Sequence, residues 1–271
     1  MPRANRYILP GHVYHITQRC HDRSFLLDFD VDRIEYRTRL RTHLKGSFVW
    51  LLAYCMTSNH VHMLVTARGL KYLSNFMHDL QGQFAEWYNF RRKRGNQYWG
   101  GRYHATMIES GTHLWNCMTY IDLNMVRAGV VRHPREWKWC GYDELIGTRK
   151  RYTVLSMDKV VELVGGGDRE QFARDYAAAL EDAIDRGDLR REPYWSESIA
   201  VGSKDYVSGI ADQIKGRAKI KVKETDGGAW SVHEPVVPYG HDANEDEGVP
   251  YGQIPGTQIE RKRGVWLLKW A

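Results

Sequence analysis

Asn59-His60-Val61-His62-Met63-Leu64-Val65 is the stretch on which the fold prediction rests. It follows the apolar run 48–56, from which only Thr57 and Ser58 separate it. Two apolar, β-branched runs joined by such a turn predict a β-hairpin. Because side chains alternate across a strand, His60 and His62 point to the same face, with Cβ atoms roughly 6–7 Å apart. That spacing lets both imidazoles reach one divalent cation.

The sequence on either side of this hairpin predicts further helices and strands. The strongest is a helix over 70–92, whose apolar residues recur at helical spacing. The elements expected in chain order are a strand at 12–18, a helix at 30–44, strands at 48–56 and 60–66, a helix at 70–92, a strand at 103–110 and a helix at 112–131. This β-α-β-β-α-β order predicts an α+β fold, a ferredoxin-like split βαβ antiparallel sheet with helices on one face and an added tyrosine-bearing helix.

The remaining sequence changes character and predicts a mostly helical C-terminal extension. Helices are expected at 157–164, 169–186 and 204–215, whereas 221–257 is rich in Gly, Pro, Asp and Glu and predicts no regular structure. The apolar residues 265–270 are expected to dock on the domain or on a partner. We therefore expect a catalytic domain at 1–150, a helical extension at 151–220, and an irregular acidic segment with an apolar tail at 221–271.

Charge is divided unevenly between the two halves of the chain. Residues 1–150 hold 22 Lys and Arg against 12 Asp and Glu, whereas residues 151–271 hold 17 against 21. The basic excess lies in the half that carries the histidine pair, which favours a polyanionic partner such as nucleic acid.

Other bulk features predict a cytoplasmic protein without a membrane partner. No run is long and apolar enough to span a bilayer, and the polar start predicts no signal peptide. The cysteines form no CxxC pair, which is typical of reduced thiols; they are Cys20, Cys55, Cys117 and Cys140.

A polar stripe runs along the helix expected at 112–131. Its members follow one another at steps of three or four residues and are His113, Asn116, Tyr120, Asn124 and Arg127. A solvent-facing side is the ordinary interpretation, but the stripe contains no Lys or Glu, which favours a partly buried site. Since two imidazoles leave a divalent site incomplete, this helix is expected to supply a further ligand.

Four motifs, taken together, resemble one known family. They are HVYHITQR at 12–19, AYCMTSNHVHMLV at 53–65, WGGRYHATMI at 99–108 and YIDLNMVRAG at 120–129. In this order, over roughly residues 6–145, they resemble the single-tyrosine HUH (His-hydrophobic-His) transposases. The similarity is greatest to the REP-associated tyrosine transposase branch.

This resemblance implies an activity and its site residues. The family's two histidines bind a divalent metal, Mg²⁺ or Mn²⁺, which places His60 and His62 as metal ligands. Tyr120 inherits the role of nucleophile and Asn124 that of the polar residue completing the metal site, where the transposon branch often has Gln. The implied reaction is cleavage and transfer of single-stranded DNA near hairpins, through a 5′-phosphotyrosine and a free 3′-OH, as in DNA transposition and recombination.

The expected partner is single-stranded DNA with a hairpin resembling a REP palindrome, bound by a monomer or a homodimer. Cationic residues expected to contact DNA are Arg3, Arg6, Arg19, Arg23, Arg91, Arg92, Lys93, Arg94 and Arg127. The run 91–94 is favoured among them. For Arg127, a phosphate contact and a salt bridge with Asp122 or Glu109 are both open. Stacking or core roles are open for Tyr7, Tyr14, Trp99 and Tyr103, and a core role is favoured for His15.

Two other functions fit parts of the sequence. A nucleic-acid-binding regulator on the same fold would bind without cutting, and the intact set His60, His62 and Tyr120 argues against it. A replication or mobilisation nicking enzyme would use the same chemistry. Such enzymes usually carry helicase regions or a second nearby tyrosine, and neither is evident here.

Overall fold

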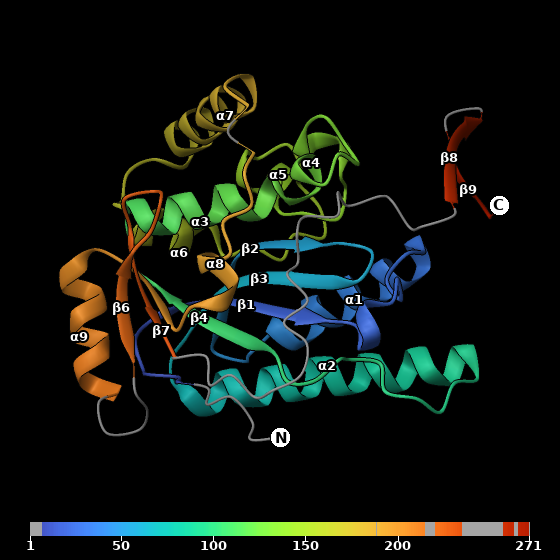
Figure 1. The fold of residues 1–271 in the computed structure, drawn as a ribbon, viewed down its shortest axis with the longest axis horizontal. Helices are drawn as coiled ribbons and strands as arrows, with labels where there is room; N and C mark the ends of the chain where they lie inside the picture. The colour runs from blue at the N-terminus through green and yellow to red at the C-terminus, as the bar shows by residue number, and fades with distance from the viewer. Residues whose placement is uncertain (1–6, 188, 215–219, 235–256, 263–264, 271) are drawn as a thin grey trace.

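A computed structural model describes residues 7–187, 189–214, 220–234, 257–262 and 265–270. Its main sheet contains the strands β1 (Val13–Arg19), β2 (Val49–Met56), β3 (His60–Ala67), β4 (His104–Ile108), β5 (Ala200–Gly202), β6 (Lys221–Glu224) and β7 (Trp230–His233). In the part of the chain described, their spatial order is β2-β3-β1-β4-β5-β7-β6 (Figure 1).

The first four strands have the ferredoxin-like arrangement predicted from the sequence. β1 lies between β3 and β4 and is antiparallel to both, and β2 pairs with β3 as a hairpin. The helices α1 (Asp30–Leu44) and α2 (Leu70–Arg92) make the two crossovers and have the predicted bounds. The register of β1 and β3 places Thr17 opposite His62 and Arg19 opposite His60.

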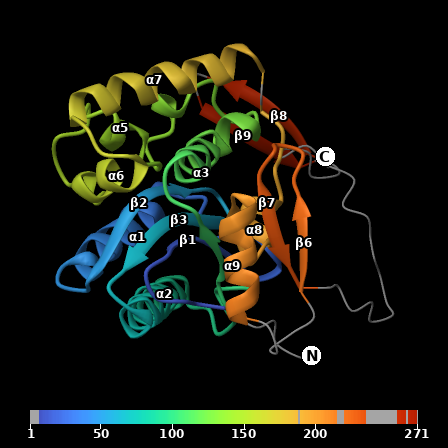
Figure 2. The same cartoon turned by 90° about the vertical axis from the view of Figure 1, so that its left-hand side faces the viewer.

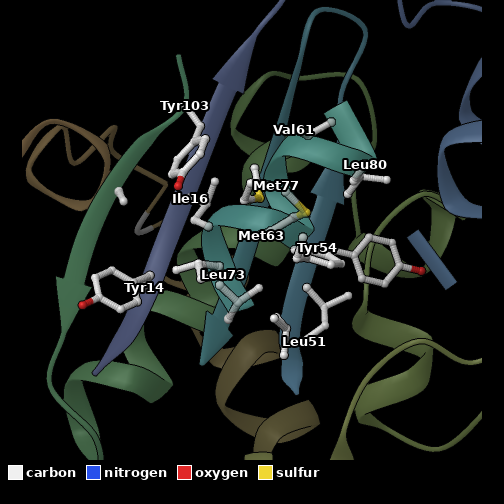
Figure 3. Close-up of a cluster of buried hydrophobic side chains, with 14 of the residues drawn as sticks. Tyr14, Ile16, Leu51, Tyr54, Val61, Met63, Leu73, Met77, Leu80 and Tyr103 are labelled. Atoms are coloured by element: carbon white, nitrogen blue, oxygen red, sulfur yellow. The ribbon is translucent and has the colours of Figure 1, made fainter. Parts of the chain in front are cut away.

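Helices cover both faces of the sheet, so the expectation of helices on one face was wrong. α1 and α2 lie on one face, while α3 (Thr112–Asp122), α6 (Met157–Val164) and α7 (Arg169–Asp185) lie on the other (Figures 1 and 2). The reason is that the central strands are apolar on both sides. In β3, Met63 joins the core beneath α2 (Figure 3), and Leu64 joins the core beneath α3.

The C-terminal extension is mostly helical as predicted, and it also adds strands to the sheet. β5 pairs parallel with β4, and β7 and β6 follow as an antiparallel hairpin. The prediction of irregular structure from residue 221 was wrong for β6 and β7, which are short and joined by a glycine-containing turn that hid the hairpin. α9 (Lys204–Ile214) was predicted correctly.

Some of the sequence predictions fall on residues whose structure or side chains are not described. Arg3, Arg6 and residues 235–256 lie outside the described residues. β8 (Thr257–Lys262) and β9 (Val265–Trp270) pair with each other in a separate two-stranded sheet. The docking expected of the apolar residues 265–270 concerns side chains outside the description and stays a prediction.

The helix expected at 112–131 is shorter and interrupted. α3 ends at Asp122, and after Leu123 (φ −75°, ψ 0°) the single turn α4 (Asn124–Arg127) follows. The Arg127 amide still donates to the Leu123 carbonyl at 2.9 Å, so the chain keeps its course. Tyr120 and Asn124 therefore remain about one helical turn apart.

Membrane-crossing helices and disulfides are not found in the described part of the chain. No helix there is long and apolar enough to cross a bilayer. All four cysteines are buried as free thiols.

A buried carboxyl group joins α3 to the C-terminal extension. Tyr176 in α7 donates its hydroxyl to Asp122 Oδ2 at 2.8 Å, and both side chains are buried. Burial raises the pKa of Asp122 to about 8, far above that of an exposed aspartate. At neutral pH the folded protein therefore holds a proton on Asp122 that the unfolded chain releases.

We predict that this proton makes stability fall as pH rises. Between the ordinary aspartate pKa of about 3.9 and the folded value, the folded state binds one more proton at this site, so its stability decreases with pH. Thermal unfolding should show a drop in Tm from pH 6.5 to pH 9, and Asp122→Asn, which resembles the protonated acid, should reduce that drop. An identical pH dependence in the two proteins would contradict the assignment.

Candidate active site

A pocket of about 220 Å³ opens where the end of β1 and the start of β3 meet α3 and α4. A segment of the C-terminal extension, residues 189–197, forms another wall and includes the single turn α8 (Tyr194–Glu197). α8 lies against β1 and β4 (Figure 1). The lining residues are Thr17, Arg19, His60, His62, Tyr120, Asn124, Arg127, Ala128, Leu189, Arg191, Ser196 and Glu197.

His60 begins β3 and its orientation is set by the preceding turn. Its Nδ1 lies 2.7 Å from Asn59 Oδ1 and 2.9 Å from Thr57 Oγ1. Asn59 Nδ2 donates to the Arg23 carbonyl at 3.1 Å, so its oxygen faces the imidazole. Since that oxygen only accepts, His60 Nδ1 carries the proton and Nε2 is the unprotonated nitrogen.

His62 lies one pleat further along β3 on the same face. The His60 and His62 ring centroids are 4.7 Å apart. His62 Nδ1 is 2.9 Å from His15 Nε2, and His62 Nε2 is 3.2 Å from Asn124 Nδ2. His62 therefore sits between two polar partners, and both histidines line the pocket as their spacing predicted.

Burial keeps both histidines neutral. Desolvation lowers the pKa of His60 to about 3, with smaller effects from Arg19, His15 and Arg191. Desolvation, followed by the nearby His60 and His15, holds the pKa of His62 well below its usual range. Neutral imidazoles are the form that ligates a metal.

The donor set in the pocket fits a divalent metal. Imidazole nitrogens and an amide oxygen suit Mn²⁺ and similar ions, and rotation of the Asn124 carboxamide would present its oxygen instead of its nitrogen. In the described part of the chain, no three or more His, Cys, Asp and Glu side chains cluster as a metal site. The ligand set would thus be His60, His62 and Asn124. An asparagine is not one of the four residue types that define such a cluster.

Tyr120 lies on α3 beside this pair and is 7% exposed. Its ring centroid is 6.3 Å from that of His62 and 6.3 Å from that of Trp195. The Arg127 guanidinium lies 4.1 Å from the Tyr120 ring centroid, and Arg127 donates to the Tyr120 carbonyl at 2.7 Å. A cation is therefore held next to the phenol at the pocket wall.

Both acids considered as partners for Arg127 bond elsewhere. Asp122 accepts the Tyr176 hydroxyl, and Glu109 accepts the Ser203 hydroxyl at 3.0 Å. The other members of the polar stripe do not line the pocket: Asn116 is exposed and His113 lies 3.5 Å from Glu109.

The C-terminal extension supplies site residues that the sequence did not indicate. Arg191 and Glu197 face the pocket and form an ion pair at 3.0 Å. The Trp195 carbonyl lies 2.7 Å from His15 Nδ1. No motif marks this segment, and only its fold brings it to β1. His15 is a satisfied core histidine as favoured, yet it also contacts His62.

The predicted DNA-binding residues separate into two groups. Arg19 and Arg127 line the pocket, and Arg23 is exposed beside it in the 3₁₀ turn η1 (His21–Arg23). Arg91 and Arg92 at the end of α2 form ion pairs with the fully buried Asp32 of α1. Part of the run 91–94 therefore has a structural role.

Lys93 in that run is exposed, whereas Arg94 and the aromatic candidates pack against other residues. Lys93 is exposed and ends α2 in the left-handed conformation (φ 52°), and the Arg94 guanidinium lies 5.7 Å from the Tyr88 ring centroid. Trp99 donates its indole N–H to the Gln81 carbonyl at 3.0 Å. The remaining aromatic candidates are buried in the core, and they are Tyr7, Tyr14 and Tyr103 (Figure 3 labels the last two).

The end of α2 and the pocket share one end of the sheet. The Gly100 amide, shortly after α2, donates to the Arg19 carbonyl at 2.9 Å. Cys20 and Trp99 form an isolated antiparallel β-bridge. The segment that follows Lys93 thus returns to the end of β1 that lines the pocket.

Comparisons with known proteins agree with the sequence motifs. Residues 9–124 match the family model described as Transposase IS200 like. This match supports the predicted resemblance to a transposase family. No curated protein matches the chain.

Two solved structures are similar to parts of this chain. One is a REP-associated tyrosine transposase bound to a REP hairpin, with a TM-score of 0.47 and 18% identity, covering 62% of this chain and 98% of that one. The other is a candidate transposase of Deinococcus radiodurans R1, with a TM-score of 0.31 and 18% identity, covering 40% of this chain and 87% of that one.

We predict that Arg91 and Lys93 differ in what their removal costs. Arg91→Ala takes a counterion from buried Asp32 and should lower the free energy of unfolding by about 1–3 kcal/mol. Lys93→Ala changes an exposed side chain and should stay within about 0.5 kcal/mol of the parent protein. Urea unfolding measures both, and equal effects would contradict a structural role for Arg91.

Proposed function

We propose that this chain, whose residues 9–124 match the IS200-like transposase family model, cuts and rejoins single-stranded DNA through Tyr120, with a divalent metal at His60, His62 and Asn124. The observation that carries the proposal is the convergence of these four side chains on one pocket from β3, α3 and α4. A nucleophile, a ligand set for a Lewis acid and nearby arginines are the groups that phosphodiester transfer needs.

Tyr120 would attack the scissile phosphorus. Its Oη–P bond forms as the P–O3′ bond breaks, which leaves a 5′-phosphotyrosine and a 3′-oxygen that takes up a proton. The phosphodiester energy is kept in the tyrosyl ester, so attack by another 3′-OH in the reverse sense rejoins DNA.

The protein groups around Tyr120 favour this chemistry. A free tyrosine ionises near pH 10, and the Arg127 cation over the ring stabilises the developing phenolate. A bound metal would supply electrostatic stabilisation of charge on the phosphoryl oxygens. The ring packing against His62 and Trp195 limits the directions in which the hydroxyl can point.

The cations at the pocket are suited to the phosphates flanking the cut. Arg19, Arg127 and Arg191 line it from β1, α4 and the C-terminal segment. Guanidinium groups match phosphate geometry and hydrogen-bond to it in pairs. Glu197 forms an ion pair with Arg191, so we expect a bound phosphate to compete with that carboxylate.

We predict that Tyr120→Phe abolishes cleavage and leaves DNA binding and folding nearly unchanged. Phenylalanine keeps the ring that packs against Arg127 and loses only the hydroxyl. The measurement is incubation with hairpin-bearing single-stranded DNA and Mn²⁺, followed by denaturing electrophoresis for a covalent protein–DNA adduct.

The control for this prediction is the parent protein in EDTA, which should form no adduct because the metal is removed. An adduct that persists in Tyr120→Phe would assign the nucleophile elsewhere. Binding without cleavage by the parent protein, with Mn²⁺ or Mg²⁺ present, would favour the non-cleaving regulator.

The form of the substrate follows from the shape and charge of the site. Tyr120 is nearly buried in a pocket of about 220 Å³, which a stiff duplex does not enter. The exposed cations Arg23 and Lys93, at the same end of the sheet, offer a wider surface. We propose that a folded DNA hairpin docks there and places an adjacent unpaired segment at Tyr120.

We predict that a hairpin with a single-stranded flank is cut faster than a fully paired duplex or an unstructured strand of equal length. Arg23→Ala with Lys93→Ala should weaken hairpin binding and flatten its salt dependence by about one counterion for each phosphate that the variant no longer binds. Cleavage at saturating DNA should not change. Equal cutting of all three substrates would exclude hairpin docking.

A further inference from the structure

We infer that His15 is a positioning residue for His62. It holds the His62 imidazole in the tautomer whose unprotonated Nε2 faces the pocket, and it is itself held by the Trp195 carbonyl of the C-terminal segment. The inference rests on the proposed function, since it gives that Nε2 the task of binding a metal.

The hydrogen bonds indicate which ring nitrogen of His15 and of His62 is the donor. The Trp195 carbonyl accepts and cannot donate, so His15 Nδ1, 2.7 Å away, carries a proton. A neutral His15 then has a lone pair on Nε2, which accepts from His62 Nδ1–H at 2.9 Å. The remaining ring nitrogen of His62, Nε2, is left unprotonated.

The opposite direction is unfavourable. If His62 Nε2 carried the proton, His62 Nδ1 would accept from His15 Nε2–H, and His15 Nδ1 would turn a lone pair toward the Trp195 oxygen. Two lone pairs 2.7 Å apart in a buried site repel each other and leave the carbonyl without a donor.

Burial makes this arrangement rigid. His15 and His62 are almost fully buried, and their rings stack with centroids 5.1 Å apart. Low polarity disfavours the imidazolium form of either ring. Trp195 is equally buried, and its indole N–H donates to Glu192 Oε2 at 2.8 Å, which fixes the segment that presents the carbonyl.

The inference gives the C-terminal segment around Trp195, which lies outside the family match, a role in orienting a metal ligand. Metal-bound histidines commonly donate their second ring nitrogen to an orienting group, and losing that group typically costs about 10- to 100-fold in metal affinity. Here the orienting group is an imidazole, and its orientation comes from residue 195, outside residues 9–124.

The test combines tautomer and metal measurements on the full chain. Long-range ¹H–¹⁵N spectra of ¹⁵N-histidine-labelled protein report which nitrogen of His62 carries the proton, and free Mn²⁺ measured by electron paramagnetic resonance reports metal affinity. In the parent protein we expect His62 protonated at Nδ1. In His15→Phe we expect mixed tautomers and Mn²⁺ binding weaker by about 10- to 100-fold.

Two further variants serve as rescue and control. His15→Gln has an amide oxygen able to accept from His62 Nδ1–H, so it should keep the tautomer and most of the affinity. His104→Phe also removes a histidine bond to the C-terminal segment, the 2.9 Å contact with the Ser198 carbonyl, and His104 does not itself line the pocket. It should change neither measurement.

Two results would overturn the inference. One is the finding that His62 in the parent protein is protonated at Nε2. This measurement does not depend on any variant being able to fold. The other is His15→Phe with unchanged tautomer and Mn²⁺ affinity. Failure of the parent protein to bind Mn²⁺ while His62 shows the expected tautomer would instead contradict the proposed metal chemistry.

Discussion

The pairing of β1 with β3 is the constraint on which the site depends. With Arg19 opposite His60 and Thr17 opposite His62, these side chains share one face and converge on the pocket. A shift of the pairing by one residue would turn the site side chains of one strand to the other face of the sheet. The neighbouring apolar residues Ile16 and Val61 prevent this because they point to the opposite face and are buried in the core beneath α2. One register therefore both fills the core and assembles the site.

Burial on both faces gives the site its chemical character. α3 and the C-terminal helices cover the face that carries the histidines, so His60 and His62 lie in a dry environment and stay neutral. The same covering raises the pKa of Asp122 to about 8. Folding thus sets protonation states that suit metal ligation on one side of α3 and stores a proton on the other.

The sequence predicted what local patterns encode. The helix 70–92 and the hairpin around Asn59 have strong periodicity and clear turn residues, and both formed as expected. β6 and β7 are too short for a periodic signal. The DNA contact predicted for Arg91 remains a prediction, and its structural ion pair with buried Asp32 was missed because a charge run does not reveal a partner about sixty residues earlier. The metal and nucleophile roles remain predictions of the motifs.

The pocket is built from both the motif-bearing part of the chain and the C-terminal extension. The resemblance to the family ends near residue 145, but Arg191 and Glu197 also line the pocket, and the proposed orientation of His62 depends on His15 and the Trp195 carbonyl. β5 continues the same sheet directly after that segment. Contacts so distant in sequence leave no local pattern, because each partner is an ordinary residue until the sheet brings them together. An extension that reads as an appendage therefore forms one wall of the pocket.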